Sequence, residues 1–309
     1  MLSARVRLLR ERDFAAPGLE LEWLLDPSWA KSRSLLVCCL SCFRREPDDL
    51  STPGDPHALV APFARAHYYR AAITMLRAFA ASLEHLHGVP RRSLRLFSNS
   101  RMPEKPLLVA SGLGAYGANG LAIVRGLGSL FVIAGAVLPF PTDGPAVEPA
   151  PDPCGSCGRC REACPVGAIV ERGVVDPRRC LQGLADDDVP LSPATMSAWG
   201  TRLYGCQTCQ EVCPRNACLA EAAPPAPGEL GPSIAIRDLL ADDDAGLRAR
   251  FRGTALGMSW ISPSALRRNA LVAAGSRGAA SLRGAVLSHA GAPDPAVSSA
   301  ASWALARLG

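Results

Sequence analysis

The spacing of the cysteines between residues 154 and 214 constrains this chain more than any other feature of its sequence. CGSCGRCREACP (154–165) reads C-x2-C-x2-C-x3-C-P, and GCQTCQEVCP (205–214) reads C-x2-C-x3-C-P, with Cys180 between them. The first spacing is typical of bacterial ferredoxins, in which the cysteine before the proline binds the other of two clusters. Cys180 supplies the ligand that the second run lacks. The pattern therefore predicts two [4Fe–4S] clusters.

The exchange of the cysteine before each proline divides the eight thiolates into two ligand sets. We expect the first cluster to be bound by Cys154, Cys157, Cys160 and Cys213, and the second by Cys180, Cys206, Cys209 and Cys164. Two zinc sites are the alternative interpretation, because paired C-x2-C motifs also occur in zinc ribbons. Zinc, however, needs neither the third cysteine of the first run nor the exchange.

The remaining cysteines and the amino terminus bear on location. Twelve cysteines in 309 residues are too few for a disulfide scaffold. The first residues, MLSARVRLLRERDF, carry too many charges for a signal peptide. We therefore expect a cytoplasmic protein. Cys218 is surplus to the motif, and Cys38, Cys39 and Cys42 lie in an apolar run where they are expected to fill space in the core.

Composition divides the chain into three regions, at 1–145, 146–220 and 221–309, with proline-rich stretches at both junctions. In the first region, KSRSLLVCCLSCF (31–43) predicts a buried strand, and apolar residues at helical spacing predict a helix within 64–87. The third region is rich in alanine and predicts short helices over 264–275, 279–291 and 294–309, stacked in the manner of HEAT repeats. The fold class expected is α+β with several domains.

Two long uncharged stretches, 106–124 and 126–142, approach the length of a membrane span. The first contains four glycines and the second ends in prolines, so neither suits a continuous helix. We interpret both as buried segments of a protein that has no membrane partner.

The cluster segment, with RLYGCQTCQEVCPRN (202–216) around its second half, resembles that of the epoxyqueuosine reductase family. The resemblance extends to RSLLVCCLSC (33–42), to the segment FSNSRMPEKPLLVASGLGAYGANGLAI (97–123), and to LRRNALVAAG (266–275) in the tail. It implies an amino-terminal α/β corrinoid-binding-like domain, a ferredoxin-like module with two clusters, and a HEAT-like helical tail.

The resemblance also implies an activity and a site. Members of this family reduce epoxyqueuosine to queuosine in tRNA through cobalamin, and an external donor such as flavodoxin or ferredoxin supplies the electrons. The cobalamin would lie against a glycine turn, whose candidate residues are Gly112, Gly114, Gly117, Asn119 and Gly120. The family's proposed proton donor is an aspartate, and Ser98 occupies its position here, with Glu104 as the nearest carboxylate.

Several departures leave a second hypothesis open. A serine hydroxyl is a far weaker acid than a carboxyl group, and residues 221–309 hold nine arginines and seven acidic residues, a weak basic excess for binding tRNA. Arg267 and Arg268 could contact phosphate or form a solvated helix face. The alternative is a diverged relative that transfers electrons or binds a partner without the tRNA substrate.

Overall fold

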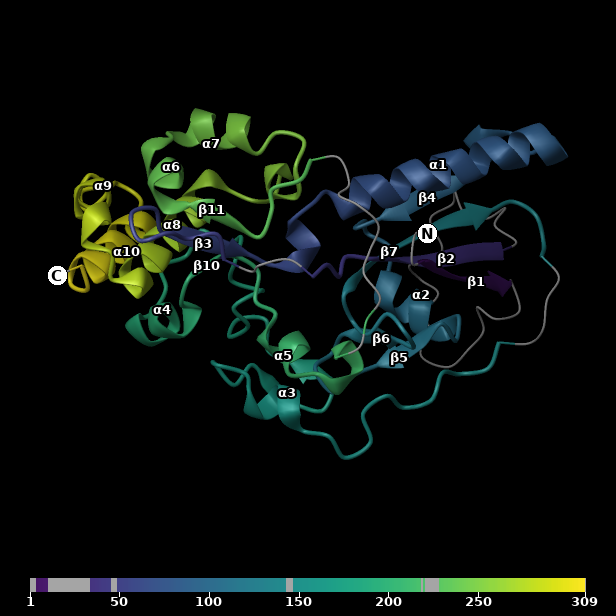
Figure 1. Ribbon diagram of the computed structural model, residues 1–309. Coiled ribbons are helices and arrows are strands. Elements are labelled where there is room, and N and C mark those ends of the chain that lie inside the picture. Colours follow the sequence, from purple (N-terminus) through teal and green to yellow (C-terminus); the bar gives the residue numbers. More distant parts are fainter. Residues whose placement is uncertain are drawn as a thin grey trace. The chain divides into compact units, whose positions relative to one another are not determined.

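The computed structural model describes residues 4–10, 34–45, 49–142, 147–217, 219 and 228–308 (Figure 1). The fold is mixed α/β and divides into two compact units. The first unit takes in Met1–Arg44, Tyr68–Gly158 and Cys213–Pro224, and the second takes in Arg45–His67, Arg159–Val212 and Pro225–Gly309. Because each unit draws on several stretches of chain, the three consecutive domains expected from composition stay a prediction.

The first unit is built on a four-stranded antiparallel sheet. Its strands lie in the order β1 (Ala4–Arg10), β2 (Ser34–Ser41), β7 (Phe131–Leu138) and β4 (Arg95–Ser98). The strand predicted within 31–43 is confirmed as β2, which pairs with β1 on one side and β7 on the other. An inner strand with both faces covered can be apolar throughout, which explains its unbroken run of hydrophobic residues.

Two helices cover this sheet, one on each face (Figure 1). Helix α1 (Tyr68–His87) confirms the helix predicted within 64–87 and packs on β7 and β4 through Ala72, Leu76 and Ala80. Helix α2 (Glu104–Ala110) packs on the other face, where its Leu107 and Leu108 share a core with alternate residues of β2. That core includes Leu35, Val37, Cys39, Ile133 and Val137.

A small hairpin follows helix α2. Strands β5 (Gly114–Tyr116) and β6 (Ala122–Val124) pair with each other, and Gly117, Asn119 and Gly120 of the glycine turn lie between them. Ala122 and Val124 enter the same core as helix α2, so the turn is held by a packed element.

The second unit has a three-stranded sheet assembled from distant parts of the sequence. Strand β3 (His57–Val60) lies in the middle, parallel to β10 (Arg202–Tyr204) and antiparallel to β11 (Ser233–Ala235). The elements of the second unit that surround the cluster cysteines in the sequence are short: α3 (Arg159–Glu162), β8 (Ile169–Glu171), β9 (Val174–Val175), α4 (Pro193–Trp199) and α5 (Thr208–Glu211).

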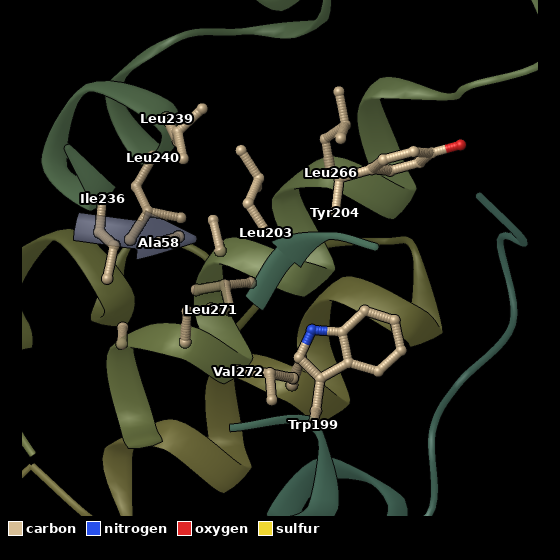
Figure 2. Close-up of a cluster of buried hydrophobic side chains, with 14 of the residues drawn as sticks. Ala58, Trp199, Leu203, Tyr204, Ile236, Leu239, Leu240, Leu266, Leu271 and Val272 are labelled. Carbon is tan, nitrogen blue, oxygen red and sulfur yellow. The ribbon is translucent and has the colours of Figure 1, made fainter. Parts of the chain in front are cut away.

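Helix α8 (Pro263–Arg277) forms the centre of the second unit. It is buried nearly all round and contributes Leu266, Leu271 and Val272 to a core that also contains Trp199 and Leu203 (Figure 2). The surrounding helices are α6 (Ile236–Ala241), α7 (Asp244–Arg250), α9 (Arg283–Leu287) and α10 (Pro295–Leu305). Their HEAT-like character stays a prediction.

Two predicted helix boundaries in this region were wrong. The helix expected to end at Gly275 continues to Arg277 and is terminated by Gly278, whose φ of 61° is the left-handed conformation that glycine adopts readily. Gly275 instead packs against α10, where a Cβ would lie 2.7 Å from the Cα of Ala304. The helix expected over 279–291 is shorter, with a 3-10 turn (Ala280–Leu282) before α9.

The helix expected over 294–309 is confirmed as α10. The carboxylate of Asp294 accepts the backbone N–H of Ala296 at 2.8 Å, and Pro295 occupies the first turn. No helix within the described ranges is long and apolar enough to span a membrane.

Candidate metal centre and active site

The first cysteine run begins in a turn and continues into a short helix. The Asp152 carboxylate accepts the backbone N–H groups of Cys154 and Gly155, at 3.0 and 3.2 Å. Helix α3 then carries Cys160, which is buried, and Cys164 follows it directly before Pro165. The local fold therefore presents successive thiols of this run from different backbone elements.

The second set of cysteines lies on equally short elements. Cys180 follows the β8–β9 hairpin, and its N–H donates to the carbonyl oxygen of Asp176 at 3.0 Å. Cys206 follows β10, Cys209 lies in α5, and Cys213 directly precedes the 3-10 turn Pro214–Asn216. Within the second unit, α5 packs against α3.

The chemistry of these side chains suits iron–sulfur clusters. All eight are free thiols, and seven are partly exposed. Two of their sulfurs accept backbone N–H bonds that would stabilise a thiolate: Ala118 donates to Sγ of Cys154 at 3.3 Å, and Ala168 donates to Sγ of Cys164 at 3.2 Å. Cys218 lies outside the described residues.

Within the described ranges, no three His, Cys, Asp or Glu side chains are grouped closely enough to hold one metal ion between them. In a [4Fe–4S] cluster each thiolate binds a different iron, so the four ligand sulfurs do not converge on one point.

The glycine turn is a compact structure whose glycines are required by the chain itself. A Cβ at Gly112 would lie 2.2 Å from the carbonyl oxygen of Glu148, and one at Gly114 would lie 2.4 Å from that of Ile123. At Gly117 it would meet the side chain of Ile123 at 2.6 Å. These glycines are therefore explained by close packing within the first unit, and exposed backbone is not needed to account for them.

The remaining turn residues connect it to its surroundings. Asn119 is buried, and its Oδ1 accepts the N–H of Leu121 at 3.2 Å. Gly120 has a φ of 71°, and its carbonyl oxygen accepts from Nζ of Lys105 at 3.4 Å. The turn is thus tied both to helix α2 and, through Ala118, to a cluster cysteine.

Ser98 ends strand β4, and its hydroxyl is already engaged. Oγ donates to the carbonyl oxygen of Ile133 at 2.8 Å. Asn99, the next residue, has a φ of 51° and is the one non-glycine residue with a positive φ among those described. Because the Ser98 hydroxyl proton is in this hydrogen bond to strand β7, it is not directed toward a substrate.

Glu104 lies at the start of α2, and its carboxyl group is a weaker acid than an ordinary glutamate. Burial raises its pKa to about 7, although hydrogen bonds from Ser100 and Asn99 lower it. The Ser100 N–H donates to Oε1 at 3.0 Å. Near neutral pH a substantial fraction of Glu104 therefore keeps its proton, which is the state that a general acid needs.

Tyr69 and Cys42 belong to the same electrostatic environment. Burial, together with negative charge on Cys42 and on Glu104, raises the pKa of Tyr69 to about 12. The phenol therefore stays protonated. Cys39 and Cys42 are buried, as expected for residues that fill the core, whereas Cys38 is partly exposed and its Sγ donates to the carbonyl oxygen of Ala134 at 3.3 Å.

The two adjacent arginines of α8 have different roles, and neither forms a simple solvated face. Arg268 is fully buried, and its guanidinium donates to the carbonyl oxygens of Leu184, Asp187 and Val189. Arg267 forms an ion pair with Asp244 at 2.7 Å. The sequence pattern gave no signal that Arg268 is an internal anchor, because an arginine on an alanine-rich helix is usually exposed.

A cavity of about 760 Å³ lies within the second unit. Its charged walls are Arg65, Arg202, Arg277, Arg307 and Glu211. All four arginines donate to carbonyl oxygens: Arg65 to Val60, Arg202 to Trp199, Arg277 to His57 and Arg307 to Trp303. Hydrogen bonds to these carbonyl oxygens hold the arginines in place. Gly205, Gln207 and Glu211, from the segment that carries Cys206 and Cys209, also line the cavity.

Comparison with known proteins supports the interpretation of the cysteines. Residues 153–216 match the family described as a 4Fe-4S double cluster binding domain, which contains all eight motif cysteines. The chain therefore has two [4Fe–4S] clusters as cofactors, and the zinc alternative is set aside.

Curated relatives are epoxyqueuosine reductases. The chain is 38% identical to that of Aliivibrio fischeri over 114 residues, which cover 37% of this chain and 30% of the relative. It is 30% identical to that of Bacillus subtilis over 224 residues, which cover 71% of this chain and 56% of the relative. The chain thus spans 30% to 59% of the length of the first such relatives.

Solved structures of epoxyqueuosine reductases have the same fold. A crystal structure with an epoxyqueuosine-modified tRNA-Tyr stem loop gives a TM-score of 0.80 at 23% identity, covering 100% of this chain and 87% of the other. The Streptococcus thermophilus structure gives 0.82 at 18% identity, covering 99% and 86%. By sequence, by fold and by its double-cluster segment, this chain is a relative of the epoxyqueuosine reductases.

Proposed function

We propose that this chain is an oxidoreductase that reduces epoxyqueuosine to queuosine in tRNA, using its two [4Fe–4S] clusters and cobalamin. The observation that carries the proposal lies in the first unit. The glycine turn donates the Ala118 N–H to Sγ of Cys154, and Lys105, next to Glu104, donates to the carbonyl oxygen of Gly120. Hydrogen bonds thus link the proposed cofactor surface to a cluster ligand and to Lys105, the residue that follows a carboxyl group of raised pKa.

The reaction needs both electrons and protons. Removing an epoxide oxygen as water takes two electrons and two protons and leaves a carbon–carbon double bond. The clusters and cobalamin, when bound, supply the electrons. Glu104 supplies a proton to the oxygen as its bond to carbon breaks, because its pKa of about 7 leaves it partly protonated at neutral pH. Tyr69, which stays protonated, is a second hydrogen-bond donor in the same region.

The ligand assignment follows the motif spacing. We assign Cys154, Cys157, Cys160 and Cys213 to one cluster and Cys180, Cys206, Cys209 and Cys164 to the other. The glycine turn is the proposed cobalamin surface, and support for it comes from the relatives, because the turn's own packing already explains its glycines. The proposed regions are 1–145 for cobalamin, 146–220 for the clusters and 221–309 for a HEAT-like tail.

The test is a reconstituted assay. Anaerobically purified protein is incubated with cobalamin, a chemical reductant and a tRNA stem loop that carries epoxyqueuosine, and queuosine is measured by mass spectrometry. We expect product only when cobalamin is present. A flavodoxin or ferredoxin should replace the chemical reductant, since the proposal includes an external electron donor in the cytoplasm.

One observation favours the second candidate, an electron-transfer or partner-binding protein that does not act on tRNA. The Ser98 hydroxyl donates to Ile133 and is not an acid, although it occupies the position of the family's proposed proton donor. The variants Ser98→Asp and Ser98→Asn, of similar size, separate the two candidates. A protonated carboxyl group at this position can donate to the Ile133 carbonyl oxygen, whereas a carboxylate cannot, so an aspartate would tend to keep its proton. Ser98→Asp should therefore increase queuosine formation, and Ser98→Asn should not. Reducible clusters with no product from any form would favour the second candidate.

A further inference from the structure

A threonine and an arginine lie behind one cluster cysteine in the second unit. Nη2 of Arg202 donates to Oγ1 of Thr208 at 2.9 Å, and that Oγ1 lies 3.7 Å from Sγ of Cys206. Arg202 is held in place, because its Nη1 donates to the carbonyl oxygens of Ala198 and Trp199. A fixed cation is therefore connected through one hydroxyl group to a sulfur.

The direction of these hydrogen bonds follows from the donors available. A guanidinium can only donate, so Oγ1 of Thr208 accepts from Arg202. A cysteine that binds iron is a thiolate and can only accept. Once Cys206 is a cluster ligand, the Thr208 O–H is left to donate to its sulfur, and the bond from Arg202 orients the hydroxyl for this purpose.

We propose that Thr208, oriented by Arg202, raises the reduction potential of the cluster that Cys206 binds. Reduction by an external one-electron donor adds one negative charge to the cluster and moves no proton. A hydrogen bond to a ligand sulfur stabilises that added charge, and so does a nearby cation. The potential of this cluster therefore depends on the side chain at position 208, whereas the bonds to Cys154 and Cys164 come from backbone N–H groups that most residue types supply.

The test is a redox titration of the protein with both clusters in place, followed by electron paramagnetic resonance. Thr208→Val keeps the shape of the side chain and removes the hydroxyl. We expect one of the two cluster potentials to become more negative by up to about 59 mV. For a one-electron couple, this shift corresponds to a roughly tenfold smaller equilibrium constant for reduction. Thr208→Ser keeps the hydroxyl and should stay near the native value.

Thr195→Val is the matched control, because the Thr195 hydroxyl lies 2.9 Å from Oγ of Ser192 and bonds to no sulfur in the described part of the chain. It should leave both potentials unchanged. Arg202→Gln should shift the same cluster as Thr208→Val, in the same direction. The proposal is overturned if Thr208→Val leaves both potentials unchanged, or if Thr208→Ser shifts them equally. The readout is a potential, so it is independent of whether the chain acts on epoxyqueuosine.

Discussion

The acidity of Glu104 predicts how the proposed activity depends on pH. A general acid works in its protonated form, and the Glu104 pKa of about 7 places the loss of that form in the neutral range. Queuosine formation should therefore fall as the pH rises through about 7. Glu104→Gln should reduce turnover about 10²-fold to 10⁴-fold and remove that pH dependence. Initial rates from pH 6 to 8.5 provide the measurement.

Glu84→Gln is the matched control for this prediction. Glu84 lies on α1 in the same unit, and hydrogen bonds from Arg91 lower its pKa rather than raise it. This variant should keep the native rate and pH profile. If Glu104→Gln retained the native profile, another group would have to supply the proton.

Arg268 predicts a large effect on stability. Burial lowers its pKa to about 10, yet the side chain stays charged at neutral pH and donates to three carbonyl oxygens of the 184–189 segment. Arg268→Met should lower the free energy of unfolding by about 3 kcal/mol, because these buried acceptors lose their partner. Arg248 is exposed on α7, so Arg248→Met should change the free energy of unfolding by less than about 0.5 kcal/mol. Urea denaturation under anaerobic conditions measures both.

Elements with a strong local signal could be predicted from the sequence. The apolar run of β2, the periodicity of α1 and the Asp-Pro start of α10 each determine their own structure. The end of α8 could not be predicted, because two glycines lie three residues apart and only the packing of α10 against Gly275 distinguishes them.

That contact between helices predicts opposite outcomes for two glycines. Gly275→Ala should destabilise the protein by about 1–3 kcal/mol, because the new methyl group meets Ala304 and the ring of Trp303 at 2.7 Å. Gly284→Ala, within α9, meets nothing within 4 Å and should be neutral or stabilise by up to about 1 kcal/mol. Thermal unfolding of the two variants, compared with the native protein, gives the ranking. Equal losses would show that Gly275 is not a packing position.

At the scale of the whole molecule, the cysteine spacing was sufficient to predict the clusters, because ligand chemistry is encoded in short motifs. The pairing of β3 with β10 and β11 could not be predicted, since these strands have three or four residues each and lie far apart in the sequence. The packing of the glycine turn could not be predicted either, because the turn contacts Glu148 and Cys154, which lie far from it in the sequence.

The exchange of cysteines between the two motifs predicts how cluster loss follows mutation. Protein purified without oxygen should contain about eight irons per chain. Cys213→Ser should damage the cluster bound by the first motif, although residue 213 lies in the second. Cys38→Ser, at a thiol outside the motifs, should keep the full iron content. Iron analysis with electron paramagnetic resonance of the two clusters is the measurement, and loss confined to the second cluster would contradict our ligand sets.

Strand β3 has a consequence for the synthesis of the chain. It leaves the ribosome early, but both of its hydrogen-bonded neighbours are made much later, and β11 is the last of the three. At about 5–20 residues per second this delay is on the order of ten seconds. During that time all eight cluster thiols are translated while the sheet of the second unit is still incomplete. Chains made in air would therefore pass through a stage in which their sulfurs are open to oxidation, so yield should depend on oxygen during expression as well as during purification.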